Sequence, residues 1–83
     1  MMKDKYLFMA ICIDVIYKNK VTTATLSRKT GYTYDSVEKL KKYLIKNNII
    51  TLDKVLTFTD KGKEIAELNN KMLLHLPYEV INV

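Results

Sequence analysis

The stretch "TGYTYDSVEKLKKYLIKNNII", residues 30–50, decides the fold, because it combines a turn, a capped amphipathic helix and the start of an extended segment. Gly31 suits the left-handed backbone that ends a preceding helix. Thr33 can cap the next helix through its hydroxyl group. We expect this helix over about residues 33–47, since an apolar stripe repeats at spacings of three and four residues at Val37, Leu40 and Leu44.

A shorter helix is predicted immediately before this stretch, in "VTTATLSRKTG", residues 21–31. Thr22 or Thr23 can cap it, Ala24 and Leu26 face inward, and Gly31 ends it. Two short helices joined by a glycine turn form a helix-turn-helix.

The segment after the stretch, "IITLDKVLTFT", residues 49–59, alternates apolar and polar positions and is rich in Thr, Val, Ile and Phe. This pattern predicts a short hairpin with Asp53 and Lys54 at its tip. A last helix follows in "DKGKEIAELNNKMLLHL", capped by Thr59 or Asp60 and stopped by Pro77.

The first segment, "DKYLFMAICIDVIYK", residues 4–18, reads as a helix or as a buried strand. Its β-branched residues favour a strand, whereas its length favours a helix. As a helix it is apolar almost all round, which predicts burial on more than one side. In a chain this small, a second buried side suggests a partner subunit.

The predicted fold class is therefore mainly α with a small β-hairpin (α+β), in the order helix, helix, helix, hairpin, helix. This is a helix-turn-helix followed by a wing. We expect one domain over residues 1–77, with the terminal helices included, and a C-terminal tail over residues 78–83.

Positive charge is concentrated in the middle of the chain. Residues 18–46 hold eight basic and two acidic residues, whereas the rest of the chain holds six basic and seven acidic ones. Such segregation is typical of a surface that binds nucleic acid.

Other classes of protein are not expected. Cys12 is the single cysteine, so no disulfide forms within one chain and no metal site can be built from thiols. His75 is the single histidine, and no glycine-rich phosphate loop or metal-ligand cluster is present, so neither enzymatic activity nor a cofactor is expected. The longest apolar run is far shorter than the roughly 20 residues of a membrane span. We expect an intracellular, cytoplasmic protein.

The sequence resembles the winged helix-turn-helix transcriptional regulators, in particular small MarR-like and PadR-like repressors. The likeness is carried by "TLSRKTGYTYDSVEKLKKYLIKNNII" and, in the correct order after it, by "LTFTDKGKEI". The resemblance implies double-stranded DNA as the partner and control of transcription as the function. The wings of the family have longer loops with basic tips, and this chain has only Asp53 and Lys54 there. Its Lys-, Ile-, Tyr- and Asn-rich composition also suits an AT-rich archaeal or viral genome.

A recognition helix enters the major groove, and its first residues lie nearest the base edges. We therefore expect base contacts from the start of the 33–47 helix, at Thr33, Tyr34, Asp35, Ser36, Glu38 and Lys39. Contacts to phosphate are expected from basic residues farther from the bases, namely Arg28, Lys29, Lys42, Lys46 and Lys54.

A two-fold dimer would present two such helices about 34 Å apart and would read a palindrome. The expected interface lies on the first and last helices, at Phe8, Met9, Cys12, Ile16, Met72, Leu73 and Leu76. Cys12 is either a small buried hydrophobe or one half of an intersubunit disulfide. The alternative function is a winged-helix module that binds protein and not DNA. No membrane partner is expected, and the sequence does not identify a small-molecule effector.

Overall fold

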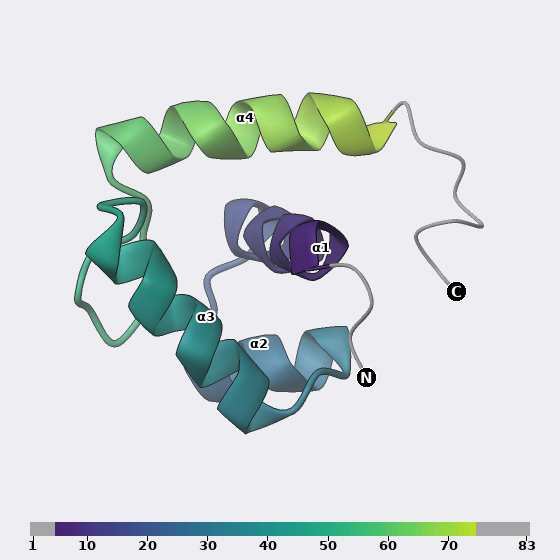
Figure 1. Cartoon of the computed structure of the whole chain (residues 1–83), viewed down its shortest axis with the longest axis vertical. Coiled ribbons are helices and arrows are strands. Elements are labelled where there is room, and N and C mark those ends of the chain that lie inside the picture. Colours follow the sequence, from purple (N-terminus) through teal and green to yellow (C-terminus); the bar gives the residue numbers. More distant parts are fainter. Residues whose placement is uncertain (1–4, 75–83) are drawn as a thin grey trace.

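The computed structural model describes the backbone of residues 5–74 and the side chains of residues 5–72. In this part of the chain there are four helices, α1 (Lys5–Lys18), α2 (Thr23–Thr30), α3 (Tyr34–Lys46) and α4 (Asp60–Leu74). The central helix is α1, which contacts both α2 and α4, while α3 packs against α2. Figure 1 shows α1 nearly end-on, between α4 on one side and the α2–α3 pair on the other.

The ambiguity of the first segment is resolved in favour of a helix. Cys12, Ile13 and Ile16 are buried in α1, and its remaining apolar side chains are mostly half-buried. The second side of α1 is covered by α4 of the same chain, where the Asn69 side chain donates a hydrogen bond to the Ala10 carbonyl at 2.9 Å. The apolar character of α1 is therefore accounted for without a partner subunit.

The two helices of the predicted helix-turn-helix and the glycine turn between them form as expected. Thr22 caps α2, and Gly31 ends it at φ 80° with its N–H bonded to the Ser27 carbonyl at 2.9 Å. The Ser27 hydroxyl also donates to the Tyr32 carbonyl at 2.6 Å, so the turn is tied back to α2. The Tyr32 ring packs edge-on against Phe8 of α1, with ring centroids 4.6 Å apart.

The predicted hairpin is wrong, and with it the winged, α+β fold class. Residues 5–74 are all-helical and contain no strand; the segment between α3 and α4 forms a single isolated antiparallel bridge, Ile50 to Phe58. The protein is therefore an all-α globule over the described residues. Lys54 lies in an irregular loop and not at the tip of a wing.

The reason lies in the backbone partners around that bridge. Two hydrogen bonds flank it, Thr51 N–H to the Thr57 carbonyl at 2.8 Å and Thr59 N–H to the Ile49 carbonyl at 3.0 Å. Beyond them, the N–H of Leu56 turns to the Val21 carbonyl before α2, at 2.9 Å. The Asp53–Lys54 pair also lacks the glycine that a tight two-residue turn prefers. A two-stranded ribbon is marginal without further pairing.

One core lies between α1, the α2–α3 pair and the loop that follows α3. Every part of the described chain contributes to it, and α4 contributes through Ala66. Its buried apolar side chains are Cys12, Ile13, Ile16, Val21, Leu26, Val37, Leu40, Leu44, Ile49, Ile50, Leu56 and Ala66.

The end of α3 packs against the start of α4 and is hydrogen-bonded to it. Asn48 takes the left-handed conformation at φ 58°, and the N–H of Ile49 bonds to the Leu44 carbonyl at 2.8 Å, which closes the helix. Thr59, which caps α4, donates its hydroxyl to the Asn48 carbonyl at 2.6 Å and accepts the N–H of Gly62 at 3.0 Å.

Gly62 lies where the two backbones approach most closely. A Cβ at this position would lie 1.9 Å from the Ile49 carbonyl oxygen. Glycine is therefore needed here for close packing, and its φ is not in the left-handed region. This contact, together with the Thr59 bonds, fixes the direction of α3 relative to α4.

Candidate nucleic-acid interface

The outward face of α3 carries three of the eight basic residues that the sequence concentrates in the middle of the chain. Asp35, Lys39, Lys42 and Lys46 recur at spacings of four, three and four residues, so they share one side of the helix. All four are exposed, and they lie opposite the buried stripe of Val37, Leu40 and Leu44. We call Lys39, Lys42 and Lys46 the cationic face.

Asp35 partly neutralises the first lysine of this face. Its carboxylate lies 3.4 Å from the Lys39 ammonium, one turn along the helix, and the two side chains are 83% and 78% exposed. A pair so exposed is held weakly, because water screens it and both side chains lose rotamer freedom. Lys39 can therefore exchange Asp35 for an anionic or acceptor group on a ligand at little cost.

The predicted base-reading residues divide into two groups. Tyr34, Asp35 and Lys39 point outward, and Tyr34 is 54% exposed. The hydroxyls of Thr33 and Ser36 are engaged with each other at 2.8 Å, and Thr33 also accepts the N–H of Ser36 at 3.2 Å.

Glu38 is the sixth predicted base-reading residue, and it is half-buried on the flank of the helix. It is therefore less available at the centre of the outward face than Lys39.

The predicted phosphate-binding residues come from three places in the chain. Arg28 and Lys29 are exposed in the last turn of α2, close to the start of α3 in sequence. Arg28 is partly oriented by the Thr25 hydroxyl, which accepts from its Nη2 at 3.3 Å. Lys42 and Lys46 continue the cationic face, whereas exposed Lys54 belongs to the loop before α4.

Tyr43 is a candidate that is absent from the DNA contacts expected from the sequence. It is 52% exposed on α3, one turn after Lys39 and beside the cationic face. Tyr43 lies three residues after Leu40, a spacing that also suits the buried stripe, so the sequence did not mark it as outward. An exposed tyrosine beside lysines can donate its hydroxyl to phosphate or stack on a sugar or base.

The predicted dimer interface is not gathered on one surface. Cys12 and Ile16 are 0% and 5% exposed, so they belong to the interior of the chain itself, and Phe8 and Met9 are half-buried. Met72 is 67% exposed on α4, and Leu68, one turn earlier, is 62% exposed. The side chain of Leu73, all of Leu76 and the tail over 78–83 lie outside the described residues.

Cys12 has no exposed surface through which to react. Burial raises the pKa of its thiol to about 12, because the thiolate is poorly solvated in the core. Burial of the Tyr32 side chain likewise raises the pKa of its hydroxyl, and the Cys12 thiolate would add a smaller contribution of the same sign. At neutral pH the thiol is therefore protonated, and it acts as a small hydrophobe in the folded chain.

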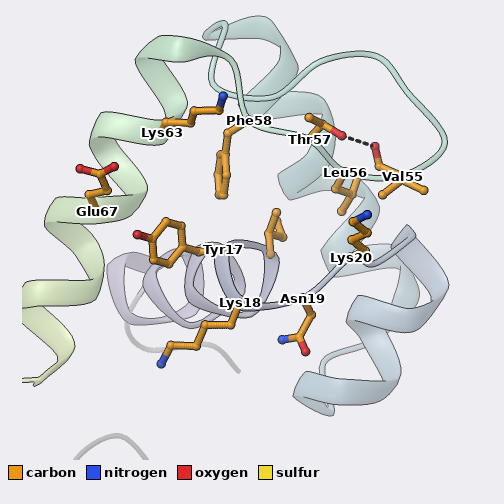
Figure 2. A pocket seen from close by; sticks show the side chains of 11 residues that line it. Tyr17, Lys18, Asn19, Lys20, Val55, Leu56, Thr57, Phe58, Lys63 and Glu67 are labelled. Carbon is orange, nitrogen blue, oxygen red and sulfur yellow. Dashed lines mark hydrogen bonds between the residues drawn. The ribbon is translucent and has the colours of Figure 1, made fainter.

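A groove is present that does not include the cationic face of α3. It has a volume of about 760 Å³ and is lined by the end of α1, the link to α2, residues 55–58 and the first turns of α4. Figure 2 shows the side chains around it. None of its lining residues comes from α3.

Comparison with protein-family models, with curated proteins and with solved structures found no match. Within the described residues, no His, Cys, Asp and Glu side chains are grouped to hold a metal ion. None of the helices described is sufficiently long and apolar to span a bilayer.

Proposed function

We propose that the chain binds double-stranded DNA through α3 and regulates transcription from a specific site. The observation that supports this most is the cationic face, three exposed lysines on one side of a well-capped helix whose other side is buried. A helix of this kind fits the major groove, which is wide enough to admit it. The sequence resemblance to helix-turn-helix repressors supports the same partner.

In this proposal the start of α3 faces the bases. Lys39 donates to guanine acceptors after it leaves Asp35, and Tyr34 donates its hydroxyl or packs against a thymine methyl group. Asp35 repels phosphate and accepts from a cytosine amino group, so it favours some sequences at a cost in total affinity. Arg28, Lys29, Lys42 and Lys46 contact phosphate.

The test is fluorescence-anisotropy binding of a mixed-sequence duplex over a range of salt concentrations. We expect log affinity to fall linearly with log salt, with a slope of about 0.9 for each phosphate contacted. The variant Lys39→Ala/Lys42→Ala should bind at least about tenfold more weakly and show a shallower slope. Its matched control is Lys63→Ala/Lys71→Ala, which removes the same charge from exposed positions on α4 and should bind as the native chain does.

Two results would reject DNA binding through α3. The first is no binding at low salt, in which case α3 becomes a face for docking a protein. The second is an equal loss in both double variants, which would mean that only total charge matters. Cytoplasmic location is part of the same proposal, because the proposed partner is DNA.

We also propose that two copies bind a palindromic site, with α4 in the contact. The support is the adjacent pair of exposed apolar side chains, Leu68 and Met72, one turn apart on α4. Leu68→Glu/Met72→Glu should shift sedimentation equilibrium toward the monomer and weaken binding to a palindrome more than to a half-site. A native chain that sediments as a monomer at all concentrations up to the millimolar range contradicts this contact.

A further inference from the structure

The groove beside α1 combines an apolar floor with a charged rim. Ile16 and Leu56 are buried at its base, and Phe58 is half-buried beside them. Tyr17 and Val55 form walls that are about two-fifths exposed, at 41% and 40%. Exposed apolar walls above a buried floor can take apolar side chains from outside the chain.

The charged residues on the rim are mostly cationic, and they are not all neutralised. Lys18, Lys20 and Lys63 line the groove with one acidic residue, Glu67. Lys18 is paired with Asp14 at 3.2 Å and points away from the groove (Figure 2). Lys20 and Lys63 remain, at the two sides of the groove, to bind an anionic group.

Lys63 is placed toward the groove even though it has an acidic neighbour one turn away. Within the described residues the i, i+4 pairs Asp14–Lys18 and Asp35–Lys39 form ion pairs, whereas Lys63 and Glu67 do not. Figure 2 shows the Lys63 ammonium beside Phe58, away from the Glu67 carboxylate. The ammonium therefore lies where an acidic group on a ligand over Phe58 would meet it.

The shape of the groove selects the size of the ligand. A small-molecule site encloses most of its ligand, whereas this groove is open to solvent. A ring-sized molecule would leave much of its surface in water here. A chain-like ligand gains contact area along the groove, and its apolar side chains alternate with groups that pair with the lysines.

We propose that this groove binds a short acidic segment of a partner protein, in which leucine or phenylalanine anchors alternate with aspartate or glutamate. The anchors lie on Ile16, Leu56 and Phe58, and the carboxylates pair with Lys20 and Lys63. A nucleic acid strand fits less well, because the buried floor of Ile16 and Leu56 is aliphatic and offers little platform for bases. The inference does not rest on DNA binding, since α3 contributes nothing to the groove.

The probe is a short fluorescein-labelled peptide that alternates aspartate with leucine and phenylalanine. Two comparison ligands accompany it, the same peptide with lysine in place of aspartate and a single-stranded oligothymidylate. Binding to the full native chain is followed by anisotropy and by two-dimensional NMR of backbone amides. We expect the acidic peptide to shift the amide signals of Tyr17, Leu56 and Phe58, while those of the α3 cationic face stay in place.

Charge reversal then tests the lysines. Lys20→Glu/Lys63→Glu should weaken binding of the acidic peptide by about tenfold or more, since each change replaces an attractive charge pair by a repulsive one. Lys39→Glu/Lys42→Glu on α3 makes the same change of net charge and should leave peptide binding unchanged. If DNA binding through α3 is correct as well, Lys39→Glu/Lys42→Glu should weaken binding of a DNA duplex, and Lys20→Glu/Lys63→Glu should leave it unchanged.

Several results would overturn the proposal. The absence of groove-centred amide shifts in the native chain, which needs no variant to fold, rejects it directly. Equal binding of the lysine peptide shows that charge does not select the ligand. Groove shifts caused by oligothymidylate in preference to the peptide assign the groove to nucleic acid.

Discussion

The two ends of α3 are held in different ways. At its C-terminal end, carbonyls of three successive residues accept bonds from elsewhere: Asn47 from the Lys61 ammonium at 3.2 Å, Asn48 from the Thr59 hydroxyl and Ile49 from the Thr59 N–H. At the N-terminal end, the Thr33 hydroxyl donates to Ser36 Oγ, and the Thr33 hydroxyl and carbonyl accept the N–H groups of Ser36 and Val37. One end is fixed by a distant part of the chain, and the other by its own first turn.

The two ends of α3 therefore have different roles: its C-terminal end sets the orientation of the helix, and its N-terminal end is available to bind a ligand. The junction with α4 sets the direction in which α3 leaves the core, because Thr59, Lys61 and Gly62 all meet its last residues. The start of α3 and its cationic face make few bonds to other elements, so they are available to a ligand. Substitutions at the junction should therefore alter stability, and substitutions on the face should alter binding.

The largest expected effect is that of Gly62→Ala. The new methyl group would lie 1.9 Å from the Ile49 carbonyl oxygen, which belongs to the backbone and cannot rotate away. We expect a loss of about 3 kcal/mol in the free energy of unfolding, since overpacking against a fixed group costs this much. Urea unfolding followed by circular dichroism measures it, and reaction of the buried Cys12 thiol with a disulfide reagent should accelerate in parallel.

Gly31→Ala is the matched control for this change. Gly31 has φ 80°, and a Cβ there would meet nothing within 4 Å. Its cost is therefore only that of the left-handed backbone, about 1 kcal/mol. If the two alanine variants are equally stable, the close approach of α4 to Ile49 does not limit stability and the junction is looser than described.

The next effect compares the two threonine caps. Thr59→Val removes a cap and leaves the Asn48 carbonyl without its 2.6 Å partner, so we expect about 2 kcal/mol of destabilisation. Thr33→Val removes only a local cap of α3 and should cost about 1 kcal/mol. Thermal unfolding of both variants under one set of conditions gives the difference, and a larger cost at Thr33 would reverse the assignment of the anchored end.

Local signals in the sequence predicted the helix-turn-helix correctly. Gly31 and the Thr33 cap act within four residues of their own position, and the stripe of Val37, Leu40 and Leu44 is buried as its spacing requires. These features need no knowledge of what packs against them.

Features that depend on distant partners were predicted poorly. The arms at Ile50 and Phe58 have strand-like composition, but Leu56 bonds to Val21 and the hairpin does not extend. On α4 the buried side is marked by Gly62 and Ala66, two small residues that admit close packing, while the larger Leu68 and Met72 are exposed. Small residues carry little hydrophobic signal, so the sequence did not mark this side of α4 as the one that packs closely.

The smallest expected effect on stability is that of Lys39→Ala/Lys42→Ala. Both side chains are exposed, the Asp35 pair is weak, and alanine is at least as good a helix former as lysine. We expect the free energy of unfolding to change by less than about 0.5 kcal/mol. Urea unfolding of this variant has to accompany the binding assay, because a loss above about 1 kcal/mol would mean that the lysine stems support the packing of α3. Weaker DNA binding would then report a changed helix, whereas weaker binding at unchanged stability assigns the effect to the cationic face itself.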